Sequence, residues 1–272
     1  MSTRDNIATD IVLSPFGADA AAMVDAARCL DESGFDGVWT LDHFSGSMLD
    51  RPWSREPFTV LGAMAAVTSE LRVGPLVANM VNRHPALLAS AASTLQSIAG
   101  GRSVLGLGSG AARGSRFAAE QDAIGRVPGP VEERRRHLVE TIEAVRLLWG
   151  GGGVYNGTYI EIDELHGVVG PEAIPPIIVG ASGPQTVGLA CEHADGVNIR
   201  VTDRTPELVH AAVQTTSGSP FEIAIYDDLD VGHPHGGAVD AWIESGVTRR
   251  TLMMSPPFDL VAIAALGDRL NA

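Results

Sequence analysis

The sequence contains no lysine, so all 19 of its basic residues are arginine, against 33 acidic residues. A chain without lysine cannot form the Schiff base that one class of aldolases makes with carbonyl substrates. The sequence also lacks a Gly-x-Ser-x-Gly motif, which argues against a serine hydrolase of the α/β type. Two common routes of covalent catalysis are therefore disfavoured from the start.

Cysteines and long apolar runs are scarce as well. The two cysteines, Cys29 and Cys191, fall within predicted helices among small apolar residues, as reduced thiols of cytoplasmic proteins do. No uncharged apolar stretch approaches the roughly 20 residues of a membrane span. The first ten residues lack the basic-then-apolar order of a signal peptide. We therefore expect a soluble cytoplasmic protein.

The net charge of −14 is unfavourable for binding nucleic acid or an anionic membrane surface. An anionic ligand would have to be held by local donors, since the overall field repels it. The His-Pro-His stretch at 233–235 has no cysteine or carboxylate cluster beside it, so we predict no metal site. The expected partner is a small-molecule substrate, with neither nucleic acid nor membrane involved.

Apolar segments alternate with amphipathic helical segments along the chain. The strand-like segments are mainly apolar rather than alternating between apolar and polar, which is typical of parallel strands that are buried on both faces. The expected strands cover residues 10–16, 36–41, 71–79, 102–108, 175–180, 195–199, 221–227 and 247–254. The helices after them cover residues 18–35, 57–70, 84–101, 131–149, 183–194, 205–214, 238–246 and 257–270.

Eight strand–helix units predict an α/β fold, namely a (β/α)8 TIM barrel. A doubly wound open sheet is the alternative, but the glycine fingerprint of its first turn is missing. The length of 272 residues suits one barrel, and no linker divides the chain, so we expect 1–272 to form a single domain. A β-hairpin insertion is expected near 153–163, because Asn156 and Gly157 between β-formers are a strong signal for a two-residue turn.

Functional groups of a barrel lie at the carboxyl ends of its strands. The second expected strand ends in Asp42 and His43. Histidine titrates near neutrality and can take or give a proton, while the aspartate could orient the ring or hold part of a cofactor. A helix cap beside a packed histidine explains the same pair.

The third expected strand contains Gly74 and Pro75, which predict a bulge or bend. The helix after it opens at Asn82, Arg83 and His84. Its backbone donors and Arg83 could meet an anion. A helix cap accounts for Asn82 equally well.

The fourth expected strand carries Gly106 and Gly108, and Gly110 follows it. Glycines at a strand end let a large planar or phosphorylated ligand approach the backbone, although ordinary turns also use them. The Glu-Glu-Arg-Arg-Arg stretch at 132–136 is interpreted as a solvated helix face.

The fifth expected strand runs through Gly180, Ser182 and Gly183 into a helix near Pro184. Such a turn exposes backbone N–H groups and the positive end of a helix dipole to a phosphate. A plain strand–helix turn is the alternative.

Taken in order, "GFDGVWTLDHF" (34–44), "PPIIVGASGPQTV" and the segments 71–110 and 138–162 resemble the bacterial luciferase-like superfamily. They are most similar to its branch that uses the deazaflavin coenzyme F420. The resemblance covers roughly residues 7–200, and the last third is shorter than is usual for the family. It implies a TIM barrel, a homodimer, and a cofactor at the carboxyl ends of the strands with its ring inward and its phosphate tail outward.

The resemblance also implies roles for individual residues. Asp42 would contact the deazaflavin head group, and His43 would take a substrate hydroxyl proton as hydride leaves for the ring. A non-prolyl cis peptide near Pro75 and Leu76, in a bulge that includes Val77, would back the ring. The remaining implied cofactor contacts are Ser109 and Gly110 along the ring, and Ala181, Ser182, Gly183 and Pro184 around the phosphate.

Two departures from the family pattern matter. Related sugar-phosphate dehydrogenases have a catalytic glutamate where this chain has Ala111, and some relatives have an acidic residue where Ser14 and Pro15 stand. A sugar-phosphate substrate is therefore not expected, and His43 is left as the main titratable candidate. The predicted function is hydride transfer between F420 and a small organic substrate. The alternatives are a monooxygenase that uses reduced FMN, and a flavin- or deazaflavin-binding protein without turnover.

Overall fold

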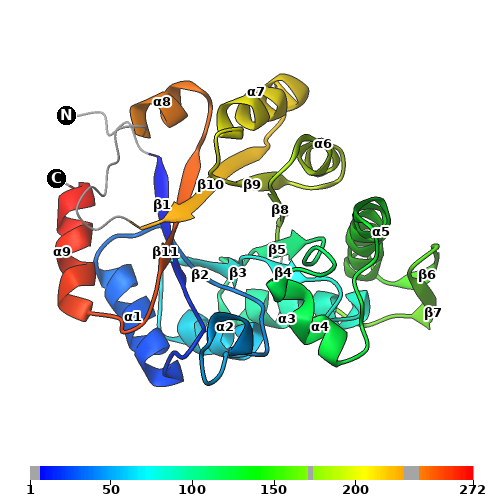
Figure 1. Cartoon of the computed structure of the whole chain (residues 1–272), viewed down its shortest axis with the longest axis horizontal. Coiled ribbons are helices and arrows are strands. Elements are labelled where there is room, and N and C mark those ends of the chain that lie inside the picture. The colour runs from blue at the N-terminus through cyan, green and yellow to red at the C-terminus, as the bar shows by residue number, and fades with distance from the viewer. Residues whose placement is uncertain (1–6, 171–173, 230–238, 272) are drawn as a thin grey trace.

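The computed structural model describes residues 7–170, 174–229 and 239–271. Nine of the strands in these residues form one parallel barrel with helices packed around the outside, and two further strands form a separate hairpin (Figure 1). The predicted (β/α)8 barrel is confirmed, because each of the eight expected strands overlaps a strand of the ring.

The ring has eight strand positions, and the third position is split in two. The strands are β1 (Ala8–Leu13), β2 (Gly37–Thr40), β3 (Arg72–Pro75), β4 (Ala78–Asn79), β5 (Leu105–Gly108), β8 (Ile177–Ala181), β9 (Gly196–Arg200), β10 (Glu222–Asp228) and β11 (Arg249–Met254). Their order is β3-β2-β1-β11-β10-β9-β8-β5-β4, and all neighbours are parallel. A bridge between Val73 and Ser103 joins the two ends, so the ring closes.

The longer helices are α1 (Ala20–Glu32), α2 (Pro57–Ala66), α3 (Pro85–Ile98), α5 (Val131–Trp149), α6 (Pro184–His193), α7 (Thr205–Thr216), α8 (Val239–Glu244) and α9 (Leu260–Asn271). Proline stands in the first turn of α2, α3, α6 and α7, where its missing N–H would have no helical partner anyway. Each helix after a strand runs back along the barrel, so its first turn lies at the rim formed by the carboxyl ends of the strands.

Short helical segments occupy the loops at this rim. These are η1 (Ser47–Leu49), η2 (Arg116–Ala118) and α4 (Ala119–Ala123). These short segments were not expected from the sequence, because each is too short to show a helical repeat of apolar residues.

Apolar residues form three clusters. Two large clusters lie between the strands and the surrounding helices. The third lies inside the barrel and is built around Val12, Trp39, Val104 and Ile178. The barrel interior is therefore a packed core, and only its upper layer is available to a ligand.

Below this core, charged side chains close the amino end of the barrel. Arg249 Nη1 lies 2.5 Å from Asp10 Oδ1, and Trp39 Nε1 donates to Asp10 Oδ2 at 2.7 Å. Arg72 pairs with Glu222 at 2.5 Å, and Arg249 approaches the same carboxylate at 3.4 Å. Burial raises the pKa of Asp10 to about 6, although Arg249 and Trp39 favour its ionised form. The network supplies the partners that buried charges require.

The break between β3 and β4 forms a shelf, defined here as Pro75, Leu76 and Val77, that turns into the barrel. Its Leu76–Val77 peptide bond is cis. The predicted bulge is thus present, but the cis bond lies one residue beyond the predicted Pro75–Leu76 position. Residue type alone does not determine which bond of such a bulge is cis, so the sequence could only bracket it.

Glycines of the adjacent strands make room for this shelf. A Cβ added to Gly106 would lie 2.0 Å from the Pro75 carbonyl oxygen. One added to Gly108 would lie 2.4 Å from Val77 Cγ2, and one added to Gly180 would lie 2.8 Å from Val77 Cγ1. The Pro75 carbonyl and Val77 occupy the space beside Gly106 and Gly108. The interpretation that Gly106 admits a ligand was therefore wrong, whereas Gly108 does line the cavity at the rim.

The hairpin β6 (Gly153–Asn156) and β7 (Glu161–Leu165) projects beside α5 (Figure 1). Gly157 N–H donates to the Ile160 carbonyl at 2.8 Å, so the turn is centred on 158–159. The predicted turn at Asn156 and Gly157 was therefore two residues early. The physical reason is Glu140 of α5, whose carboxylate accepts the N–H groups of residues 158, 159 and 160 at 2.7–3.0 Å.

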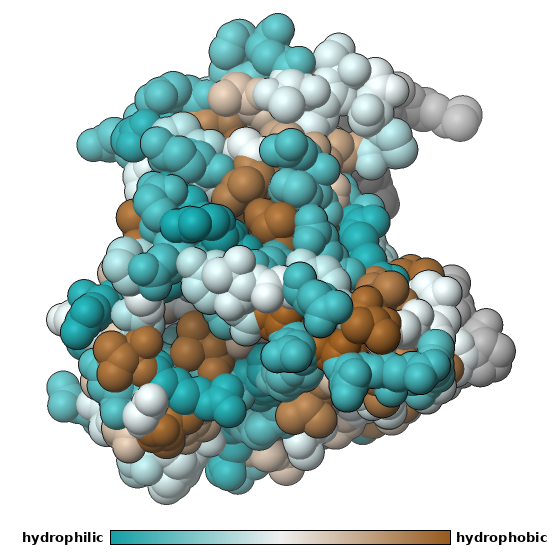
Figure 2. All heavy atoms as spheres, turned by 90° about the vertical axis from the view of Figure 1, so that its right-hand side faces the viewer, coloured by the Kyte–Doolittle hydropathy of each residue, from teal (hydrophilic) through white to brown (hydrophobic). Residues whose placement is uncertain are grey.

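On the face that bears α5 and the hairpin, apolar side chains occur in separate patches between hydrophilic ones (Figure 2). Among the described helices, none has the length together with the apolar character that crossing a membrane requires.

Gly108→Ala tests whether the shelf depends on its glycine neighbours. Val77 is already confined by Gly180 on its other side, so the new methyl group should displace the shelf and lower the free energy of unfolding by about 1–3 kcal/mol. The matched control is Gly188→Ala in α6. A Cβ added there would have no heavy atom from outside its own helix within 4 Å, so alanine should stabilise the helix by about 0.5–1 kcal/mol. Urea denaturation measures both changes, and equal stabilities of Gly108→Ala and the parent chain would contradict the packing argument.

Candidate active site

A cavity of about 590 Å³ lies at the carboxyl rim of the barrel. Its floor is the shelf together with the glycine-rich ends of β5 and β8. The cavity is lined by Leu41, Asp42, His43, Leu76, Val77, Asn79, Gly108, Ser109, Gly110, Ala111, Ala112, Ser115, Phe117, Val131, Arg134, Arg135, Gly180, Ala181, Ser182, Gly183, Thr186, Asn198, Arg200 and Tyr226. The strand ends of β2, β5, β8, β9 and β10 therefore contribute to one site.

Most of the predicted site residues meet in this cavity. Asp42, His43, Leu76, Val77, Ser109, Gly110, Ala181, Ser182 and Gly183 all line it. Pro75 and Pro184 are not among the lining residues; Pro75 ends β3 and Pro184 begins α6. Ala111 also lines the cavity.

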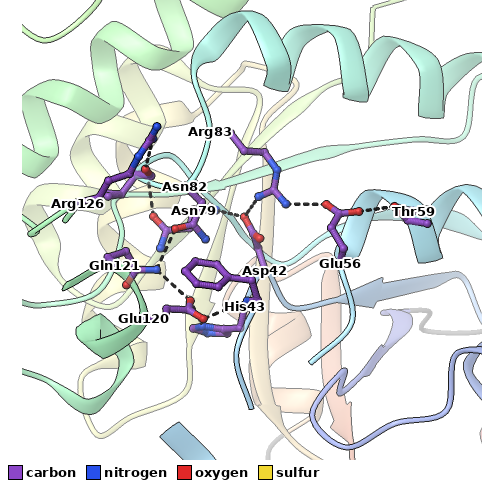
Figure 3. A network of polar contacts seen from close by, with 12 residues as sticks. Asp42, His43, Glu56, Thr59, Asn79, Asn82, Arg83, Glu120, Gln121 and Arg126 are labelled. Carbon is purple, nitrogen blue, oxygen red and sulfur yellow. Dashed lines mark hydrogen bonds and ion pairs between the residues drawn. The ribbon is translucent and has the colours of Figure 1, made fainter. Parts of the chain in front are cut away.

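Asp42 is buried and engaged by other parts of the chain. Its Oδ2 atom accepts the Asn79 N–H at 2.8 Å and pairs with Arg83 (Figure 3). Arg83 also pairs with Glu56 at 2.6 Å, and the two carboxylates raise the pKa of Arg83 against the effect of its burial. Arg83 is thus committed to neutralising carboxylates within the chain, so the interpretation of Arg83 as an anion donor was wrong.

The helix that follows Arg83 is capped by His84, whose Nδ1 accepts the Ala86 N–H at 3.2 Å. The alternative that Asn82 caps this helix was therefore wrong by two residues. Asn82 instead accepts a hydrogen bond from Gln121 Nε2 at 2.9 Å.

His43 lies between two aromatic rings and touches a buried carboxylate. Its ring centroid is 5.2 Å from that of Phe16 and 6.1 Å from that of Phe117. Its Nδ1 atom lies 2.7 Å from Glu120 Oε1 (Figure 3). The His43 side chain is 19% exposed, whereas that of Glu120 is 1% exposed.

Glu120, at the start of α4, joins the two loops above the barrel. Its Oε2 accepts the N–H groups of Phe44 and Ser45 at 3.0 and 3.1 Å, and its Oε1 accepts Gln121 Nε2 at 3.0 Å. Burial opposes ionisation of Glu120, but the hydrogen bonds from His43, Ser45 and Gln121 outweigh it and hold its pKa below the usual value. Glu120 is therefore an ionised carboxylate at neutral pH.

Two arginines from the first turn of α5 reach the cavity. Arg134 Nη1 donates to the carbonyl oxygens of Gly110 at 2.7 Å and Ser109 at 3.3 Å. Arg135 pairs with Glu132 at 2.6 Å and lies 3.5 Å from Gln185 Oε1 of α6. The interpretation of 132–136 as a solvated face was therefore wrong for Arg134 and Arg135.

The charge of Arg134 is poorly compensated by the chain itself. Burial and the neighbouring Arg135 guanidinium both lower the pKa of Arg134. The Nε atoms of Arg134 and Arg135 and the Ser115 hydroxyl are buried, and each lacks a hydrogen-bond partner among the described residues. An anion beside the two guanidinium groups would relieve their mutual repulsion.

The turn before α6 completes this polar end of the cavity. Gly183 is the N-cap of α6 and supplies no side-chain cap, so no side chain satisfies the first N–H groups of the helix. Ser182, Gly183 and Thr186 line the cavity here. On the adjoining strands, Arg200 stacks over the Tyr226 ring with 5.3 Å between its Cζ atom and the ring centroid.

Four residues of the site were not predicted from the sequence: Glu120, Arg134, Arg135 and Arg200. One signal could have found the α5 arginines: the first turn of every helix in this fold lies at the same rim as the strand ends. For Glu120 the sequence offers no such signal, since its partner His43 lies 77 positions away and α4 is only five residues long.

Comparisons with known proteins agree with this architecture. The model of the luciferase-like monooxygenase family matches residues 5–217. The chain belongs to this family.

Two curated relatives are similar to about two thirds of this chain. The 5,10-methylenetetrahydromethanopterin reductase of Archaeoglobus fulgidus is 32% identical over 176 residues, which cover 64% of this chain and 48% of the relative. The F420-dependent hydroxymycolic acid dehydrogenase of Mycobacterium tuberculosis is 33% identical over 188 residues, which cover 68% of this chain and 51% of the relative. The chain thus spans about half the length of the curated relatives it matches.

Among solved structures, an F420-dependent secondary alcohol dehydrogenase in complex with an F420–acetone adduct aligns with a TM-score of 0.78. The alignment covers 97% of this chain and 98% of that chain at 17% sequence identity. At 17% sequence identity, this structural similarity is evidence for the fold alone.

Proposed function

We propose that this protein is an oxidoreductase that transfers a hydride between coenzyme F420 and a small organic substrate. The observation that carries the proposal is the layout of the cavity. His43 follows β2, on one side of the apolar shelf around the barrel. Arg134 and the first turn of α6 lie on the other side, where β5 and β8 end. The names of the relatives, two of which specify F420, support the choice of cofactor.

The cavity residues fit such a cofactor. The side chains of Leu76 and Val77 offer an apolar surface on which a planar ring can lie. Ser109 and Gly110 would border that ring. Arg134, Arg135 and the uncapped first turn of α6 at Ser182 and Gly183 would hold the phosphate of the tail, whose negative charge would offset that of the two arginines.

The chemistry divides between cofactor and protein. When bound, the deazaflavin supplies a ring carbon that accepts a hydride from a substrate carbon or returns it. His43 supplies the proton site: it takes the hydroxyl proton of an alcohol as it becomes a carbonyl compound, and returns that proton in the reverse direction. The shelf and the rim loops orient the reactants and exclude water.

The substrate end of the cavity is apolar. His43 is flanked by Phe16 and Phe117, and Leu41 lines the same side. Ala111 places no carboxylate there. We therefore infer that the substrate is an alcohol or carbonyl compound with apolar groups next to the reacting carbon.

The first experiment is a titration of the purified protein with F420 and with FMN, followed by fluorescence or absorbance. We expect F420 to bind at micromolar concentrations and FMN at least about tenfold more weakly. Tighter binding of FMN would instead favour the monooxygenase alternative, which an oxygen-consumption assay with reduced FMN would then test. F420 binding in which His43→Ala changes no activity on any alcohol or ketone would favour a binding protein without turnover.

Arg134→Ala tests the proposed phosphate end of the site. Losing a charge-assisted contact of about 1.5–3 kcal/mol should weaken F420 binding roughly 10- to 100-fold. The matched control is Arg146→Ala on the same helix, because Arg146 is half-exposed and pairs with Asp195 away from the cavity. Equal F420 affinities of the two variants would show that Arg134 does not hold the cofactor.

We further propose that the chain, as one barrel domain with its hairpin, assembles as a homodimer through α2 and α3. Leu87 and Ile98 of α3 are 64% and 47% exposed. The neighbouring outward positions of α2, Gly62 and Ala63, are small and allow close approach of a second copy. Exposed large apolar side chains on a pair of adjacent helices are typical of an interface.

Light scattering coupled to gel filtration tests the assembly. We expect a mass twice the 28.4 kDa of the chain. Leu87→Glu together with Ile98→Glu should shift the mass to that of one chain. Val154→Glu, on the exposed hairpin, should leave it unchanged. A monomeric parent chain would contradict the proposal.

A further inference from the structure

Every acceptor position of the Glu120 carboxylate faces a donor. Oε2 receives two backbone N–H groups, from Phe44 and Ser45, and Oε1 receives the amide of Gln121. The remaining contact of Oε1 is His43 Nδ1 at 2.7 Å. An ionised carboxylate has about four lone-pair sites and no proton to give, so the contact with His43 requires a proton on Nδ1.

The tautomer of His43 follows from this contact. A neutral imidazole carries one proton, and if that proton is on Nδ1 then Nε2 is an acceptor. Because Nδ1 is turned to the buried carboxylate, Nε2 is the ring nitrogen available to the cavity that His43 lines. His43 is thereby presented to the cavity as a proton acceptor.

We propose that Glu120 is a positioning residue that fixes His43 in the Nδ1–H tautomer and stabilises the imidazolium formed when Nε2 takes a substrate proton. The catalytic part of this inference rests on the proposed function. The proton moves from the substrate hydroxyl to Nε2, and Nδ1–H stays bonded to Glu120, which remains ionised. Glu120 touches neither substrate nor cofactor.

The geometry supports this role beyond loop anchoring. Glu120 lies on the short helix α4, where Gln121 is the only other buried polar side chain. Gln121 also donates a hydrogen bond to the Glu120 carboxylate. Besides His43, the titratable groups that line the cavity are Asp42, whose carboxylate is paired with Arg83, the arginines 134, 135 and 200, and Tyr226. Among the described residues, Glu120 is therefore the one carboxylate hydrogen-bonded to His43.

Glu120→Gln is the sharpest variant, because it reverses the hydrogen bond without changing the shape. The single amide oxygen of glutamine is required by the two backbone N–H groups of Phe44 and Ser45. Its NH₂ group then takes the place of Oε1, beside both His43 and Gln121. It donates one proton to His43 Nδ1, which forces the ring proton onto Nε2, and the other to Gln121 Oε1 once the Gln121 amide turns over. The variant should fold but present a donor to the cavity in place of an acceptor.

Nuclear magnetic resonance of the cofactor-free protein tests the tautomer directly. Long-range ¹H–¹⁵N spectra of ¹⁵N-histidine-labelled protein are recorded at alkaline pH on the neutral rings, and the His43 signal is assigned by its loss in His43→Ala. We expect Nδ1–H in the parent chain and Nε2–H in Glu120→Gln. Asp31→Asn is the matched control, since Asp31 also accepts backbone N–H groups, of residues 69 to 71, far from the cavity. An Nε2–H parent ring, or one tautomer in both proteins, would overturn the proposal.

A kinetic cycle tests the consequence for proton transfer. F420 reduction is followed with 2-propanol and cyclohexanol as probe alcohols, in the parent chain, Glu120→Gln, His43→Ala and the double variant. We expect Glu120→Gln to lower kcat at least about 100-fold with F420 affinity changed less than about threefold, and to have no further effect when His43 is absent. A similar loss in both backgrounds would mean a structural role and overturn the proposal. If F420 fails to bind the parent chain, the proposed function falls, while the spectra still decide the tautomer.

Discussion

The site depends on one close approach, that of Val77 to the glycines of β5 and β8. Side chains at positions 108 and 180 would occupy the space that Val77 fills, so these positions have to be glycine if the shelf is to turn into the barrel. The shelf in turn raises the cavity floor above the packed core of Val12, Trp39, Val104 and Ile178. The surface on which a ligand can lie is thus formed by the shelf, which fills the barrel above its packed core.

The sequence predicted the fold well because the evidence for a barrel is repeated eight times. Each strand is apolar, each helix is amphipathic, and an error of a few residues at one boundary leaves the count unchanged. The hairpin turn shows the limit of local signals. Asn156 and Gly157 favour a turn where they stand, but Glu140, from a separate helix, binds three N–H groups further on and moves the turn to 158–159. Tertiary contacts of this kind cannot be deduced from a local pattern.

The candidate site was predictable to the extent that it lies at strand ends. Asp42, His43, Ser109 and the turn at 181–183 meet in one cavity because parallel strands bring their carboxyl ends together. What the sequence could not show is how the charged groups pair. Arg83 was expected to be available to an anion and is bound to Asp42 and Glu56. Arg134 was expected to face solvent, but it is half-buried, and it pairs with no carboxylate among the described residues.

Glu120 also has a mechanical consequence. Its carboxylate holds residues 43–45, its neighbour Gln121 holds Asn82, and Arg126 donates to the Val81 carbonyl at 2.9 Å. These hydrogen bonds therefore join the loops after β2, β4 and β5 into one unit. None of these loops can move independently of the others while the bonds are intact.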